Sequence, residues 1–177
     1  MARPAPGNFI GCSVQTCVAG SPLATYAPSR VPGRGAKTLQ YRVAGGFRKM
    51  RRLNPEAIHP PFAKYAHGIE VDPGARMVFC SGQLGIGREG VIPEDVEAQA
   101  RLCFRAIAAI LDEASMSLAD LVRLNAYVVS AQYLGGYMKV RDEFVSNPPP
   151  ASTLMIVQGF ARPEFKIEIE AVAARAP

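Results

Sequence analysis

The chain has 177 residues, a mass of 19.0 kDa and four cysteines, and 49% of its residues are hydrophobic. This is the composition of one ordinary globular domain with a core of its own. It excludes a membrane-spanning helix, because no apolar run approaches the roughly 20 residues that a span needs. The four cysteines form no C-x-x-C pair, which argues against a zinc ribbon or a thioredoxin-type site, and so apolar a core needs no disulfide scaffold.

The charge is divided unevenly along the chain. Residues 1–49 carry seven basic and no acidic side chains, whereas residues 50–177 carry thirteen basic and fifteen acidic ones. The net charge of +5 therefore comes from the N-terminal segment, and the rest of the chain is mildly acidic. Because proteins that hold phosphate backbones usually carry positive charge on a folded face, we expect no nucleic-acid partner.

Residues 1–49 form a predicted leader outside a domain that spans residues 50–177. The leader is rich in Gly, Pro, Ser and Ala, and its apolar residues follow no helical or strand period. We interpret it as a disordered tail or as upstream sequence that the native protein lacks, with Met50 as a sensible start. The alternatives are an organelle transit peptide and a basic arm that binds anions. We accordingly predict a cytoplasmic protein, with organelle targeting as the alternative.

The domain alternates strands with helices. Residues 76–81 form a short β-rich run, and Pro93, Glu94 and Asp95 have the residue types that open a helix, with Pro93 at its first position. Apolar residues then recur at steps of three and four, which predicts an amphipathic helix with one buried stripe. The members of this stripe are Val96, Ala100, Cys103, Ile107, Ile110 and Ala114.

The second half of the domain continues the alternation. Ser117 and Asp120 have capping-box spacing, and residues 121–130 predict a strand. A second helix is predicted over residues 134–145, ended by Asn147 and three prolines, and further strands are predicted over 153–158 and 165–173. The helical positions of the second helix are occupied by Leu134, Tyr137, Val140, Arg141 and Phe144.

The order of elements predicts an α+β domain in which two helices cover one face of a mixed sheet. The last strand alternates strictly, with Phe165, Ile167, Ile169 and Ala171 on one face. The opposite face of the sheet carries polar side chains mixed with apolar ones. A half-polar sheet face on so small a domain predicts self-association.

Two weaker motifs predict neither a cofactor nor a metal. Residues 85–90 match G-x-G-x-x-G, but no helix begins at the glycines, as pyrophosphate binding requires. His59 and His67 have no carboxylate or cysteine at ligand spacing. We therefore expect no cofactor and no metal.

Four separated segments, in order, resemble the RidA/YjgF family of reactive-intermediate (enamine/imine) deaminases. They are the S-G-Q that follows the first strand, the helix P-E-D-V-E-A-Q-A-R, the P-P-A-S-T segment and the terminal K-I-E-I-E-A-V-A. The resemblance covers residues 50–177. It implies a chorismate-mutase-like subunit, a homotrimer whose sheets form a central barrel, and sites for a small-molecule substrate in the clefts between subunits.

The resemblance also implies the site residues. Glu168 falls on the family's water-orienting glutamate. A carboxylate is suited to this role because it can accept a proton from water. Ser81 and Gly82 fall on the strand end that contributes to the cleft, and Tyr65 falls on a tyrosine that lines it. Met138 stands where the family has an asparagine, and Thr153 completes the P-A-S-T segment.

One position departs from the family pattern. Active deaminases of the family carry P-A-R-[ST], whose arginine clamps the substrate carboxylate, and this chain has Ser152 there. Loss of a charged hydrogen-bonding pair removes roughly 1.5–3 kcal/mol of binding. The departure predicts an imine, enamine or carbonyl-like ligand without a carboxylate, unless Arg162 in the following loop replaces the clamp.

Two classes of function follow. The first is a hydrolase that deaminates a small reactive enamine or imine, with Glu168 activating water. The second is a non-catalytic trimer that binds a small molecule or regulates a partner. Ribonuclease activity, which is attached to some family members, gains no support from the acidic domain.

Overall fold

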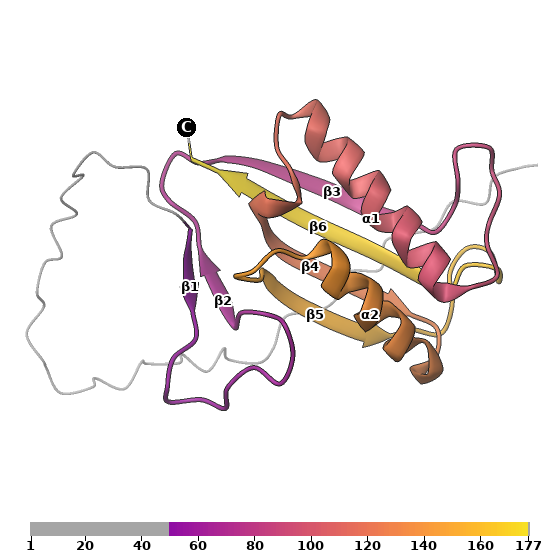
Figure 1. The fold of residues 1–177 in the computed structure, drawn as a ribbon, viewed down its shortest axis with the longest axis horizontal. Coiled ribbons are helices and arrows are strands. Elements are labelled where there is room, and N and C mark those ends of the chain that lie inside the picture. Colours follow the sequence, from indigo (N-terminus) through magenta and orange to yellow (C-terminus); the bar gives the residue numbers. More distant parts are fainter. Residues whose placement is uncertain (1–49, 177) are drawn as a thin grey trace, which may run out of the picture. The chain divides into compact units, whose positions relative to one another are not determined.

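The computed structural model describes residues 50–176, so the predicted leader lies outside the described residues. Four strands form one mixed sheet in the order β3-β6-β4-β5, and two helices cover one of its faces (Figure 1). The elements of this layer are β3 (Arg76–Leu84), α1 (Val96–Glu113), β4 (Leu121–Val128), α2 (Leu134–Phe144), β5 (Ala151–Ile156) and β6 (Ile167–Arg175). The predicted α+β class and helix arrangement are confirmed.

A small antiparallel pair precedes the sheet and was not predicted. It consists of β1 (Arg51–Leu53) and β2 (Gly68–Glu70). Three-residue strands are too short to show an alternating pattern, which is why the sequence did not reveal them. No helix among the described residues is long and apolar enough to cross a membrane.

The topology places β6 in the middle of the sheet and β5 at its edge. β6 pairs antiparallel with both β3 and β4, whereas β4 and β5 are parallel. Parallel neighbours need a crossover connection, and α2 supplies it across the face that α1 also covers (Figure 1). Within residues 50–176, no helix covers the other face of the sheet, which we call the open face.

The prediction that Pro93 occupies the first position of the helix is wrong: α1 starts three residues later, at Val96. Asp95 is the N-cap, because its carboxylate accepts a hydrogen bond from the backbone N–H of Ala98. The capping box of Ser117 and Asp120 is present as predicted. Of the predicted stripe, Val96, Ala100, Cys103 and Ile107 are buried, and Ile110 and Ala114 are half-buried.

The alternation of the last strand is also confirmed. Ile167, Ile169 and Ala171 enter the core beneath the helices, whereas Glu168 and Glu170 alternate with them and lie on the open face. On the neighbouring strand, the register shifts between Cys80 and Gln83, so that two residues of β3 oppose one residue of β6. This bulge extends β3 beyond its predicted end at residue 81.

The fully buried side chain of Gln99 joins α1 to the start of β6. Its Nε2 donates to the carbonyls of Pro93 (2.7 Å) and Glu164 (2.8 Å), and its Oε1 accepts from the N–H of Lys166 (2.8 Å). The amide nitrogen donates two hydrogen bonds and the amide oxygen accepts one, as expected for a buried amide. One side chain therefore satisfies three backbone groups of two separate segments.

We expect Gln99→Met to destabilise the domain by about 2–4 kcal/mol, because the substitution leaves three backbone groups without their partner. Urea denaturation followed by circular dichroism measures the change. Gln132→Met is the matched control, since Gln132 is exposed and, within residues 50–176, only its backbone N–H and not its side chain is hydrogen-bonded; it should stay within about 0.5 kcal/mol of the wild type. Equal stability of the two variants would contradict the role assigned to Gln99.

Candidate functional site

Glu168 lies on the open face, where β6 passes the bulge of β3. Its register partners are Tyr127 on β4 and Leu84 on β3. The carboxylate is packed against the backbone of Gly82: a Cβ atom at that position would lie 1.6 Å from Oε1 of Glu168. The S-G-Q segment therefore needs glycine at this position for the carboxylate to occupy its place.

The two glutamates of the last strand have different surroundings. Glu170 accepts hydrogen bonds from Nδ2 of Asn125 (3.2 Å) and from the hydroxyl of Tyr127 (3.1 Å). Desolvation and then this bond to Glu170 raise the pKa of Tyr127. Glu168 forms no hydrogen bond or ion pair with any residue that the structure describes. Glu170 is thus tied into the sheet, whereas both oxygens of Glu168 remain available.

A polar network crosses the open face beside Glu170. Arg123 donates from Nε to Oδ1 of Asn125 (2.8 Å) and from Nη2 to Oγ1 of Thr153 (2.7 Å). The network links β5, β4 and β6 through these side chains. The predicted site residue Thr153 is therefore held by Arg123 on the open face.

Ser152 lies on the other face of the sheet. It pairs in register with Leu124, a core residue, and so points toward the helices. The Ser152 hydroxyl lies close enough to the buried hydroxyl of Tyr137 on α2 to influence the pKa of that group. Burial raises the pKa of Tyr137 to about 12, while the charge of Arg141 and the Ser152 hydroxyl partly oppose that rise. The Tyr137 hydroxyl has no partner of normal hydrogen-bond geometry among residues 50–176.

Met138 is half-buried on α2 and contacts an arginine that the sequence did not single out as a site residue. Nη1 of Arg141 donates to Sδ of Met138 at 3.0 Å, and its Nε and Nη2 both donate to Oδ1 of Asp142. Arg141 is only 4% exposed. The available signal was its position within the apolar spacing of the predicted helix, where a charge is unusual.

Tyr65 lies in the loop between β1 and β2, close to the edge of the sheet. The next residue, Ala66, donates its N–H to the carbonyl of Pro150 (2.9 Å) and forms a bridge with Ala151. The ring of Tyr65 meets His67 edge-on, with 5.6 Å between the centroids. The loop thus runs beside the start of β5, where Ser152 lies.

The predicted site residues therefore fall into two groups on opposite faces of the sheet. Gly82, Thr153 and Glu168 belong to the open face, with Ser81 exposed at the bulge. Ser152 and Met138 belong to the helical face near the β5 edge. One copy of the chain does not bring the two groups together, because the sheet separates them.

The contacts of Arg162 involve no residue of either group. Its guanidinium pairs with Glu164 (3.1 Å) and lies over the ring of Phe165, and its side chain is 53% exposed. The possibility that Arg162 replaces the clamp therefore finds no support in its contacts.

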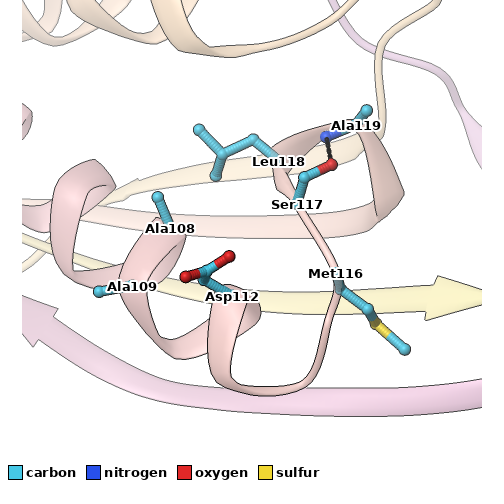
Figure 2. Close-up of a pocket in the computed structure, with 7 residues that line it drawn as sticks. All are labelled: Ala108, Ala109, Asp112, Met116, Ser117, Leu118 and Ala119. Carbon is cyan, nitrogen blue, oxygen red and sulfur yellow. Dashed lines mark hydrogen bonds between the residues drawn. The ribbon is translucent and has the colours of Figure 1, made fainter.

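Two hollows formed by the described residues lie away from these side chains. One, of about 540 Å³, follows α1 and the turn after it, and Figure 2 shows its small side chains around Asp112. A second hollow, of about 360 Å³, lies between β2 and the open face and includes Arg123 and His67. Neither is lined by Glu168, Gly82 or Ser152. Within residues 50–176, no group of three or more His, Cys, Asp or Glu side chains is placed to hold a metal ion.

Comparison with known proteins identifies the family. The family model described as Endoribonuclease L-PSP matches residues 56–175. The 2-iminobutanoate/2-iminopropanoate deaminase of Salmonella typhimurium is 31% identical over 130 residues, which cover 68% of this chain and 91% of that protein.

Solved structures show the same fold. The Rid family protein YyfB from Yersinia pestis superposes with a TM-score of 0.62 at 31% identity, covering 70% of this chain and 97% of that one. RidA from the Antarctic bacterium Psychrobacter sp. PAMC 21119 gives a TM-score of 0.53 at 28% identity, with coverages of 64% and 89%. The match of the family model over most of the domain, with these relatives, shows that the chain belongs to the RidA/YjgF family.

Proposed function

We propose that this protein hydrolyses a small reactive enamine or imine to a carbonyl compound and ammonia, in clefts between the subunits of a homotrimer. The deaminase names of its relatives support the reaction class. The observation that carries the proposal is the geometry of Glu168, whose carboxylate is seated against Gly82 and has no partner in the described chain.

The division of the site residues supports the assembly. Glu168 and Ser152 lie on opposite faces of one sheet, so a cleft that includes both must be completed by a second copy. The open face also carries large exposed apolar side chains: Phe79 is 73% exposed and Met77 is 46% exposed. Such a face is typical of a surface that another protein covers. A chorismate-mutase-like trimer, with the open faces directed inward, would bury these residues.

The proposed mechanism uses Glu168 as a general base and then as a general acid. The carboxylate accepts a proton from a water molecule as the water oxygen attacks the carbon of the C=N bond. The imine enters in its protonated form, so the resulting carbinolamine is neutral. The Glu168 carboxylic acid then returns its proton to nitrogen, ammonia leaves with the electrons of the C–N bond, and the carboxylate accepts the hydroxyl proton, which leaves the carbonyl. Tyr65, Ser81 and Thr153 line the cleft, and the domain of residues 50–177 supplies every group in this scheme.

We expect Glu168→Gln to lower turnover by about 10²–10⁴-fold, because the amide cannot accept the proton. Ammonia release from freshly generated 2-iminopropanoate measures the rate. Glu170→Gln is the matched control, since its amide oxygen still accepts from Asn125 and Tyr127; its rate should remain within a few fold of the wild type. Absence of turnover by the wild type on a broad panel of imines would overturn the proposal and favour a non-catalytic binding trimer.

Gly82→Ala should lower turnover by about 10²-fold, because the new Cβ displaces the carboxylate of Glu168 and misplacement by about 1 Å is that costly. The same assay measures the loss. Gly135→Ala, on α2, is the control, because a Cβ there meets nothing within 4 Å and the helix gains stability. A fully active Gly82→Ala variant would disprove the assigned position of the carboxylate.

A further inference from the structure

Tyr65 lies between two neighbours that are both tied to the segment before β5. On one side, Nζ of Lys64 donates to the backbone carbonyls of Asp142 (3.1 Å) and Val145 (2.7 Å). On the other side, the N–H of Ala66 donates to the carbonyl of the residue just before β5 (2.9 Å). The backbone of Tyr65 is therefore held at both adjacent residues.

The ammonium group of Lys64 binds these carbonyls and no carboxylate among residues 50–176. Its two acceptors lie at the C-terminal end of α2, where Val145 is the C-cap. The last carbonyls of a helix have no partner within the helix, and the helix dipole favours a cation beside them. Lys64 thus fastens the loop between β1 and β2 to a helix end that is suited to receive it.

A second cation connects the start of the domain to the same segment. Nε and Nη2 of Arg52 donate to the carbonyls of Pro149 (2.9 Å) and Pro148 (2.6 Å). Arg52 belongs to β1, whereas Lys64 adjoins Tyr65 in the loop. Lys64 is therefore the side-chain anchor that acts directly on the position of Tyr65.

The ring of Tyr65 is oriented by its neighbours, and its hydroxyl is available. The ring contacts those of Phe62 and His67 edge-on, with 6.1 Å and 5.6 Å between the centroids. The hydroxyl forms no hydrogen bond with any residue of the described part of the chain, and Tyr65 is half-buried. A half-buried hydroxyl without a protein partner is suited to bind a polar ligand atom.

We propose that Lys64 is a positioning residue, which holds Tyr65 in place so that the Tyr65 hydroxyl forms a hydrogen bond to the substrate. The inference rests on the proposed function and adds to it a residue that does not touch the substrate itself. A loop that is anchored before the substrate arrives loses less conformational entropy on binding. Lys64 thus acts on substrate affinity and leaves the proton transfers at Glu168 unchanged.

Steady-state kinetics of Lys64→Met test this role. Ammonia release is measured with 2-iminopropanoate, or with whichever imine of the panel the wild type hydrolyses fastest. We expect KM to rise about three- to tenfold, because the substrate must then order the loop, while kcat stays within about twofold. Lys64→Arg should restore KM, since a guanidinium can donate to the same carbonyls. Lys139→Met is the matched control and should change neither constant, because Lys139 lies on the surface of α2 and pairs with Glu97.

Combination with Tyr65→Phe separates positioning from a general loosening of the domain. Tyr65→Phe keeps the ring and removes the hydroxyl, so it should raise KM by itself. Adding Lys64→Met should then change KM by less than about twofold, since the two residues act through one contact. A merely structural role of Lys64 would raise KM by the same factor in both backgrounds. Circular dichroism shows whether each variant is folded, and Lys64→Gln replaces Lys64→Met if the latter is not.

The outcomes distinguish this inference from the proposed function. An unchanged KM in the folded Lys64 variant, an unchanged KM in Tyr65→Phe, or equal effects of Lys64→Met in both backgrounds would overturn the positioning role, while imine turnover by the wild type still supported the deaminase. Absence of turnover by the wild type on the whole panel would overturn both.

Discussion

The close approach of β3 to the side chain of Glu168 is the constraint on which the candidate site depends. At the bulge of β3, the backbone of Gly82 occupies the space beside a carboxylate on the neighbouring strand, and a single Cβ would fill it. The bulge re-aims the strand at this point, as such irregularities do next to functional sites. The result is an acid that faces outward from the sheet, lies close to backbone and has no hydrogen-bond or ion-pair partner within residues 50–176.

The open face shows how two acids of the same strand acquire different surroundings. Glu168 and Glu170 are two residues apart and point the same way, so neither the alternating pattern nor the composition separates them. Their neighbours on β4 do: Asn125 and Tyr127 both reach Glu170. Arg123 extends that arrangement to β5, and the polar network that results holds the sheet together on its uncovered side.

The helices and strands of the main sheet layer could be predicted from the sequence because the patterns that specify them involve residues close together in the chain. Strict alternation placed Ile167, Ile169 and Ala171 in the core, and the capping box of Ser117 needs only three residues. Site geometry depends on contacts between distant segments, which no period encodes. Arg141 was visible as one position of an amphipathic helix, but its relation to Ser152 and Tyr137 arises only when α2 packs on β5. Gln99 was missed for the same reason, since its three partners lie on other segments.

The three side-chain hydrogen bonds of Gln99 connect α1 to the start of the strand that carries Glu168. The N–H of Lys166 is bound to this amide, and Glu168 follows only two residues later on β6. The entry of β6 into the sheet is therefore set from the first turn of α1. Fraying of that turn would release the N–H of Lys166 and loosen the start of β6, so the thermal stability of this end of the helix and the order of the candidate site are linked.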